Sequence, residues 1–200
     1  MRMKYDRIHR VLTTHCRRDY FSSWNADYKR EVLAHTLDFL RQDLGKRGDL
    51  TSDLILDEFT KCKKVEARIV VKNNGIAAGI EELQYFIKHV SECGLGRVVI
   101  KELKSDGEHL KKGDTLLSLA GKAIDILRIE RVTLNLLQRM SGVATLMRCF
   151  ADNVPANILI APTRKTLWGM LDKRACLIGG GGTHRLNLSD AVIVKDTHLR

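Results

Sequence analysis

The chain has 200 residues, of which 44% are hydrophobic and 29% charged, and its formal net charge at pH 7 is +10. This composition suits one large or two small globular domains and excludes a disordered or collagen-like chain. No apolar run approaches the roughly 20 residues that span a bilayer, and no signal-peptide core follows the first residues, so we expect a cytoplasmic protein.

The positive charge is concentrated at the start of the chain. Residues 1–30 hold eight Lys/Arg and three Asp, half of the net excess, and their apolar and aromatic residues predict a basic, partly helical N-terminal extension. We interpret it as a surface appendage or part of a subunit contact, with a nucleic-acid-binding arm as the alternative. The five cysteines are widely spaced without a CxxC pair, which argues against a disulfide framework or a zinc site.

Residues 31–129 are expected to form an α/β sandwich. Apolar periodicity predicts helices over 31–42 and 81–93, and strands over 65–71 and 98–103. Between the first helix and the first strand, Asp49 and Thr51 are good helix-capping residues.

One long helical pattern covers residues 121–150 and has a polar side. This side carries Arg131, Asn135, Gln138 and Arg139. A stripe of this kind is commonly just solvated, and we assign Arg139 a structural role. Pro155 ends the helix, and we place the boundary of a second domain, residues 130–200, within the helical region.

The second domain contains two short β-branched runs, 158–161 and 191–194, with a helix-like piece and four glycines (179–182) between them. Each run stops at polar residues, which is typical of βα units whose strands end in a catalytic loop. Five cation-capable residues follow these elements: Arg164, Lys165, His184, Arg185 and Lys195. If the runs are parallel strands, these side chains share one rim and suit a polyanionic ligand. The glycines either cradle a phosphate or form a flexible connection.

Several motifs resemble quinolinate phosphoribosyltransferase in order and spacing. They are TRKT (163–166), GGGGTHR (179–185) and IVKDTH (193–198), preceded by GDLT (48–51), NNGIAAG (73–79), DGEHLKKGDTL (106–116) and IERVTLNLLQRMSGVAT (129–145). The resemblance covers roughly residues 36–200. It implies an N-terminal α/β sandwich domain followed by the first part of an α/β barrel of the type II phosphoribosyltransferase kind. The barrel is incomplete here, because the family continues through further barrel strands.

The resemblance also implies an activity. The family's enzymes, pentosyltransferases also called carboxylating nicotinate-nucleotide diphosphorylases, join quinolinate to phosphoribosyl pyrophosphate in de novo NAD biosynthesis. They release pyrophosphate and CO₂ and form nicotinate mononucleotide. The implied cofactor is Mg²⁺, bound with phosphoribosyl pyrophosphate, and no residue of this chain is assigned to the metal.

The resemblance assigns roles to seven residues. Arg164, His184 and Arg185 are expected to hold the two carboxylates, together with Arg131 contributed across the interface of a homodimer. Lys165 and Lys195 are the expected catalytic residues and contact phosphoribosyl pyrophosphate, and Thr163 helps to bind it. Trp168 stands where the family commonly has proline, and we expect a packing role or a pocket wall.

Three departures from the family pattern keep alternatives open. Pro162, Thr183 and Thr197 replace residues that are usual beside the cations, so a related phosphoribosyltransferase with another acceptor, such as nicotinate, is the first alternative. A basic nucleic-acid-binding or regulatory fragment that uses residues 1–30 is the second. We also expect these 200 residues to belong to a longer polypeptide or to need a second chain, so turnover by the chain alone stays open.

Overall fold

The computed structural model describes residues 15–21, 25–94 and 96–200. The elements in chain order are η1 (Asp19–Phe21), α2 (Ala26–Leu44), α3 (Leu50–Ile55), α4 (Glu58–Cys62), β1 (Lys64–Val70), β2 (Gly75–Ile76), α5 (Ile80–Glu92), β3 (Val98–Glu102), β4 (His109–Leu110), β5 (Thr115–Lys122), α6 (Ala123–Asp152), α7 (Met170–Ile178) and η2 (Asp196–His198). None of the helices in these ranges combines the length and apolar character needed to cross a membrane.

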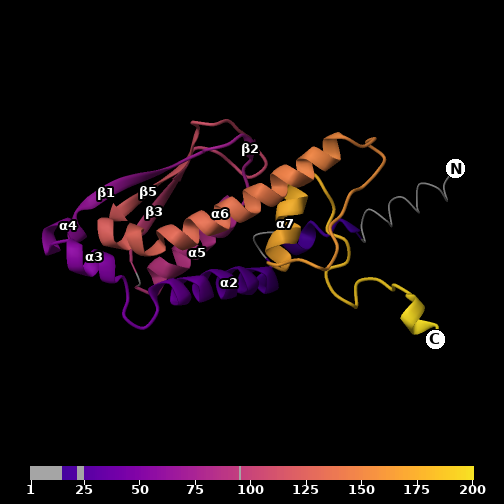
Figure 1. Cartoon of the computed structure of the whole chain (residues 1–200), viewed down its shortest axis with the longest axis horizontal. Coiled ribbons are helices and arrows are strands. Elements are labelled where there is room, and N and C mark those ends of the chain that lie inside the picture. Colours follow the sequence, from indigo (N-terminus) through magenta and orange to yellow (C-terminus); the bar gives the residue numbers. More distant parts are fainter. Residues whose placement is uncertain (1–14, 22–24, 95) are drawn as a thin grey trace.

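The first half of the chain is a layered α/β unit (Figure 1). Strands β1, β5 and β3 form an antiparallel sheet with β5 in the centre, and β2 pairs with β4. Alternate residues of β1 are partly buried and exposed, because successive side chains of a strand point to opposite faces. Helices α5 and α6 pack on one face of the sheet, and α2 packs against both of them. The predicted α/β class and the predicted helices and strands of this half are confirmed. Asp49 caps α3 as predicted, since its Oδ1 accepts a hydrogen bond from the Ser52 N–H at 3.1 Å.

Helix α6 links this unit to the rest of the chain. It is continuous from Ala123 to Asp152, so the predicted boundary between residues 129 and 130 falls inside a helix and not in a linker. Its first half packs on the sheet and its second half packs on α7 (Figure 1). The division into domains 31–129 and 130–200 stays a prediction.

The two predicted strands of the second half are not strands. Residues 158–161 and 191–194 have no regular secondary structure and pair with no other segment as a ladder. The Ile160 carbonyl accepts a single bond from the Gly182 N–H at 2.7 Å, and Val192 is 91% exposed. A strand needs a hydrogen-bonded neighbour, and the described residues provide none here. The expected partial barrel over 130–200 is therefore represented by the end of α6, by α7 and by irregular segments.

The described part of residues 1–30 is not an appendage. Phe21 and Tyr28 are buried and pack with Leu177 and Leu186, while Arg17 forms an ion pair with Asp190 at 3.1 Å. Helix α2 already begins at Ala26, because the Asn25 side chain accepts hydrogen bonds from two backbone N–H groups of its first turn. The predicted boundary at residue 30 thus falls inside α2. Residues 1–14 and 22–24 lie outside the described ranges.

A buried polar cluster joins α2, α5 and α7. The Tyr28 hydroxyl donates to Glu82 Oε1 at 2.8 Å, and Arg174 Nε lies 3.5 Å from the same oxygen. Burial raises the pKa of Glu82 to about 7, and the charge of Asp106 adds to this, while Arg174 and Tyr28 oppose it. The folded protein therefore favours the protonated form of Glu82 over a wider pH range than the unfolded chain.

Replacing Glu82 with glutamine should remove a pH dependence of stability. Because the pKa rises on folding from 4.5 to about 7, the contribution of Glu82 is fully present below pH 4.5 and is lost as the pH rises through 7. Urea denaturation from pH 5 to 8 should show wild type losing on the order of 2 kcal/mol relative to Glu82→Gln. An exposed glutamate at the other end of α5 provides the control, since Glu92→Gln should follow the wild-type profile. Parallel profiles for wild type and Glu82→Gln would contradict the assignment.

Candidate active site

The candidate site is built around α7, which is flanked by the two segments that carry most of the predicted cations. Three consecutive charged residues of this helix, Asp172, Lys173 and Arg174, each bind a different part of the fold. Asp172 and Lys173 are buried, and Arg174 is partly buried. Burying charged groups is costly unless they are paired and hydrogen-bonded, so each has a specific partner.

Asp172 fixes the segment after TRKT. Its carboxylate accepts two hydrogen bonds from Arg139, at 2.9 and 2.8 Å, and two more from the backbone N–H groups of Leu167 and Trp168. Burial alone would raise the pKa of Asp172, but the Arg139 guanidinium and the two N–H donors outweigh it and the pKa is lowered. Arg139 therefore has a structural contact, and the chain after Lys165 is attached to both α6 and α7.

Trp168 holds the same segment to α2. Its ring lies 5.1 Å from the Phe39 ring and 5.5 Å from the His35 ring, centroid to centroid. These contacts give Trp168 the packing role that was one of the two roles expected for it.

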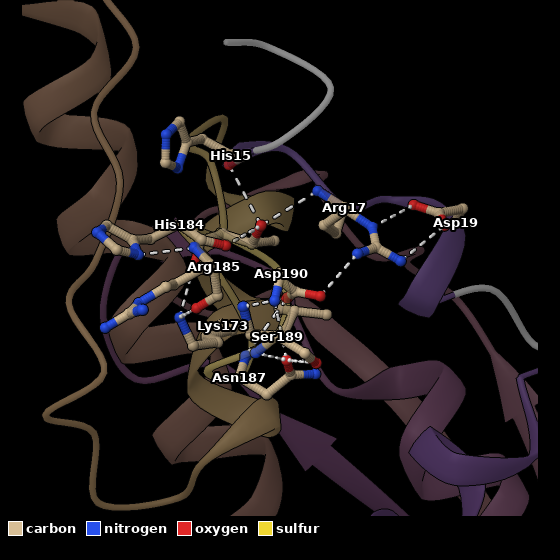
Figure 2. A network of polar contacts seen from close by, with 11 residues as sticks. His15, Arg17, Asp19, Lys173, His184, Arg185, Asn187, Ser189 and Asp190 are labelled. Atoms are coloured by element: carbon tan, nitrogen blue, oxygen red, sulfur yellow. Dashed lines mark hydrogen bonds and ion pairs between the residues drawn. The ribbon is translucent and has the colours of Figure 1, made fainter. Parts of the chain in front are cut away.

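Lys173 holds the loop that carries His184 and Arg185. Its Nζ donates to the carbonyl of Thr183 at 2.5 Å and to that of Arg185 at 3.3 Å (Figure 2). Burial lowers the pKa of Lys173, and the nearby positive charge of Arg164 lowers it further. Sequence reasoning missed this residue, because a lysine between an aspartate and an arginine in a short helix resembles a solvated position.

A hydrogen bond to the ring of His184 defines the tautomer of its neutral form. Its Nδ1 accepts a hydrogen bond from the Arg185 N–H at 2.6 Å, so the ring proton of the neutral form is on Nε2. Burial lowers the pKa of His184, and the neighbouring His15 and Lys173 act in the same direction. With Nδ1 occupied as an acceptor, the neutral imidazole can present its Nε2–H group as a donor to an anion.

Arg185 is 8% exposed, and its guanidinium is held by the Ala191 carbonyl, which accepts from Nη1 at 2.8 Å. Its Nε is buried and has no hydrogen-bond partner among the residues that the structure describes. A buried donor without a partner is costly, and an anionic ligand would satisfy it.

The glycine run serves packing. All four of its backbone N–H groups already donate to carbonyls: those of Gly179, Gly180 and Gly181 to carbonyls of α7, and that of Gly182 to the carbonyl of Ile160. A Cβ at residue 181 would lie 2.8 Å from Met147 Cγ, and one at residue 182 would lie 2.6 Å from the His15 carbonyl. The absence of side chains lets the run pass close to α6 and to residue 15, and it leaves no N–H free to cradle a phosphate. Of the two predicted roles, the phosphate cradle is therefore not supported.

Direct contacts join two of the seven predicted site residues, and a third acts on the same lysine through its charge. His184 and Arg185 lie in the loop whose carbonyls bind Lys173. The positive charge of Arg164 lowers the pKa of the same lysine. Arg131, Thr163, Lys165 and Lys195 are exposed, and no contact within the described ranges joins them to this group. The Thr163 hydroxyl accepts from the Lys165 N–H, and the Lys195 N–H donates to His198.

The positions of the acidic residues that the structure describes bear on metal binding. Within 15–21, 25–94 and 96–200, no group of three or more His, Cys, Asp or Glu side chains lies close enough to hold a metal ion. Asp190, the acid near the loop, is paired with Arg17. The described residues thus offer cations for an anionic ligand and no carboxylate cage for a metal.

Two family models match the chain. Residues 49–141 match "Quinolinate phosphoribosyl transferase, N-terminal domain", and residues 143–200 match the C-terminal domain of the same family. The two matches meet within α6.

Curated relatives agree with these matches. A probable nicotinate-nucleotide pyrophosphorylase [carboxylating] of Methanothermobacter thermautotrophicus is 38% identical over 167 residues, which are 81% of this chain and 56% of the relative. The protein of the same description in Bacillus subtilis is 40% identical over 176 residues, 85% of this chain and 56% of the relative. The chain thus spans about half the length of these relatives.

Solved structures show the same fold. The nicotinate-nucleotide pyrophosphorylase of Ehrlichia chaffeensis is 37% identical, with a TM-score of 0.73 over 83% of this chain and 59% of that one. The pyrophosphorylase of Francisella tularensis is 26% identical, with a TM-score of 0.74 over 85% of this chain and 59% of the other.

Proposed function

The chain belongs to the quinolinate phosphoribosyltransferase family, and on this premise we propose that the protein joins quinolinate to phosphoribosyl pyrophosphate. The products are nicotinate mononucleotide, pyrophosphate and CO₂, as in de novo NAD biosynthesis. The observation that carries the proposal is a group of three side chains related through Lys173: His184 and Arg185 lie in the loop that Lys173 binds, and the charge of Arg164 lowers the pKa of the same lysine.

This group suits a pyridine dicarboxylate. Arginine can bind a carboxylate through two parallel N–H donors, and Arg185 has a buried Nε that lacks a partner within the described part of the chain. Neutral His184 adds an Nε2–H donor. Together these side chains can neutralise two carboxylates and fix the ring nitrogen for attack on the ribose carbon.

Two lysines complete the proposed chemistry. As the bond to pyrophosphate breaks, negative charge grows on the departing oxygens, and fixed cations stabilise that charge more than they stabilise the ground state. We assign this role to Lys165 and Lys195, with Thr163 beside Lys165. All three residues are exposed. Once the ring nitrogen is glycosylated, its positive charge stabilises the electron pair that departing CO₂ leaves on the neighbouring ring carbon. A proton from solvent then takes the place of the carboxylate, so decarboxylation needs no organic cofactor. Mg²⁺ would arrive bound to phosphoribosyl pyrophosphate.

The active form is proposed to be a cytoplasmic homodimer in which Arg131 of a second subunit completes the carboxylate site. Large apolar side chains are exposed on the outer face of the sheet and along α6: Val70, Val99, Leu103, Leu127, Leu146 and Phe150. Exposed apolar patches are typical of protein interfaces. Arg131 is exposed on α6 and has no partner within the described chain, as expected for a side chain that acts in a neighbouring subunit.

The two alternative functions, use of another acceptor such as nicotinate and nucleic-acid binding by residues 1–30, have less support. Thr183, one of the departures from the family pattern, is buried and hydrogen-bonded inside its loop, so it does not favour a monocarboxylate such as nicotinate by lining the pocket. For a nucleic-acid arm, Arg17 is already paired with Asp19 and Asp190.

Release of labelled CO₂ from carboxyl-labelled quinolinate tests the proposed function. The intact protein, supplied with Mg²⁺ and phosphoribosyl pyrophosphate, should release CO₂ and form nicotinate mononucleotide in equal amounts. Substituting nicotinate for quinolinate separates the two acceptors. Absence of CO₂ release from quinolinate would refute the proposal, and equal turnover of nicotinate would favour the alternative acceptor.

Replacing Arg164 with alanine should weaken quinolinate binding by about 10- to 100-fold, because a charge-assisted hydrogen-bond pair contributes about 1.5–3 kcal/mol. Arg164 is exposed, so thermal stability should stay close to that of wild type. Isothermal titration with quinolinate gives the affinity. The control is Arg47→Ala, an exposed arginine far along the chain from these motifs, which should leave the affinity unchanged. An affinity for Arg164→Ala equal to that of Arg47→Ala would remove Arg164 from the site.

A further inference from the structure

The backbone of His184 is in a conformation that side chains rarely adopt. Its φ is 57°, and it is the one residue other than glycine with a positive φ among those described. The left-handed region is unfavourable for a residue with a Cβ, because the Cβ lies too close to the following carbonyl oxygen. Such a conformation persists only where the surroundings impose it, and it is frequent at ligand-binding sites.

Every backbone polar group of residues 183–185 has a partner (Figure 2). The N–H groups of Thr183 and His184 both donate to the His15 carbonyl, and that of Arg185 donates to the His184 ring. The His184 carbonyl accepts from the Thr183 hydroxyl at 2.8 Å. The carbonyls on either side of it, those of Thr183 and Arg185, both accept from Lys173 Nζ.

We propose that Lys173 is a positioning residue whose ammonium group, by binding the carbonyls before and after His184, holds the loop in its left-handed turn and presents the His184 ring and the Arg185 guanidinium to the dicarboxylate. The binding consequence rests on the proposed function. The effect on the loop does not, because it follows from the hydrogen bonds alone.

The surroundings of Lys173 support this role. It is 2% exposed, and within the described ranges its ammonium contacts carbonyls and no carboxylate. Desolvating an ammonium group is costly, and a leucine or methionine would fill a buried helix position without that cost. The ammonium group adds a donor that both the Thr183 and the Arg185 carbonyl accept from. The two carbonyls can point at the same atom only if the chain turns at His184, between them.

The neighbouring Arg174 provides a matched control. It lies on the same helix and is also largely buried, but its guanidinium binds Glu81 and Glu82 of α5. Lys173→Met and Arg174→Met each remove one charge from α7 and retain an unbranched side chain. Both should lower stability, and only the first should release the loop.

Nuclear magnetic resonance of the two variants and wild type, in the full protein, tests the proposal. In wild type and Arg174→Met, the His184 ring should be the Nε2–H tautomer, with Nδ1 accepting the Arg185 N–H. In Lys173→Met that signature should become an average of both tautomers, and the amides of residues 183–185 should exchange with solvent at least about 10-fold faster. An unchanged tautomer and unchanged exchange in Lys173→Met, or the same change in Arg174→Met, would overturn the proposal.

A measurement on wild type covers the case in which Lys173→Met does not fold. The Lys173 ammonium should give a slowly exchanging ¹H–¹⁵N signal with hydrogen-bond couplings to the carbonyl carbons of residues 183 and 185. A signal averaged like that of an exposed lysine would contradict the proposal. Quinolinate titration of the same samples separates the two levels: no binding by wild type would refute the proposed function, while the tautomer and exchange data still decide the role of Lys173.

Discussion

Replacing Asp172 with alanine should lower the free energy of unfolding by about 3 kcal/mol, the lower end of the cost of breaking a buried ion pair. The Asp172 side chain is 5% exposed and its partner Arg139 is 33% exposed, so the arginine regains part of its hydration and the loss is not larger. Alanine also leaves the backbone N–H groups of Leu167 and Trp168 without an acceptor. Urea denaturation followed by circular dichroism measures the change.

An ion pair of the same kind on the surface gives the control. Asp152 lies 3.9 Å from Arg148, one turn away on α6, and is 62% exposed. Asp152→Ala should therefore change the free energy of unfolding by less than about 0.5 kcal/mol. A loss below about 1 kcal/mol for Asp172→Ala would show that the Arg139 contact does not hold α7 to α6.

The ion pair between Asp172 and Arg139 also fixes a segment next to the candidate site. Leu167 and Trp168 follow directly after the TRKT motif, and their N–H groups bind the carboxylate that Arg139 binds. Because Trp168 also packs on Phe39, the segment after Lys165 is attached to three helices. We expect Asp172→Ala to loosen Arg164 as well, without removing any group that touches the substrate.

The sandwich half of the fold could be predicted because its signals are local. Apolar periodicity over a dozen residues decides between helix and strand, and α5, α6 and β1 follow that periodicity closely. The same reasoning failed at 158–161 and 191–194. Those runs have the composition of strands, but a strand also needs a hydrogen-bonded neighbour, and composition does not say whether one is present.

The residue types of the candidate site could be predicted from the sequence, but the contacts that hold these residues in place could not. The sequence pattern and the family resemblance pointed to Arg164, His184 and Arg185. They did not indicate that Lys173 holds the loop or that residue 15 accepts its N–H groups. Those contacts join positions that are distant in sequence or adjacent to other charges, and burial is what distinguishes them from solvated residues.

Replacing Gly179 with alanine should lower the free energy of unfolding by about 3 kcal/mol, as expected for overpacking against backbone. The added Cβ would meet the Ala144 carbonyl oxygen and would lie 2.8 Å from Met147 Cβ. Both contacts involve parts of α6 that cannot rotate away. The φ of Gly179 is −70°, which alanine adopts readily, so steric contact accounts for the whole effect. Thermal and urea denaturation measure it.

A second glycine to alanine change should have the opposite sign. Gly142 lies inside α6, and a Cβ there would have nothing within 4 Å. Gly142→Ala should therefore raise the free energy of unfolding by about 0.5–1 kcal/mol, because alanine loses less conformational freedom in a helix. If the glycine run cradled a phosphate, Gly179→Ala would weaken the binding of phosphoribosyl pyrophosphate by more than its loss of stability explains. Since the Gly179 N–H already donates to the Ala175 carbonyl at 2.9 Å, the loss should appear in unfolding, and any loss of binding should follow from it.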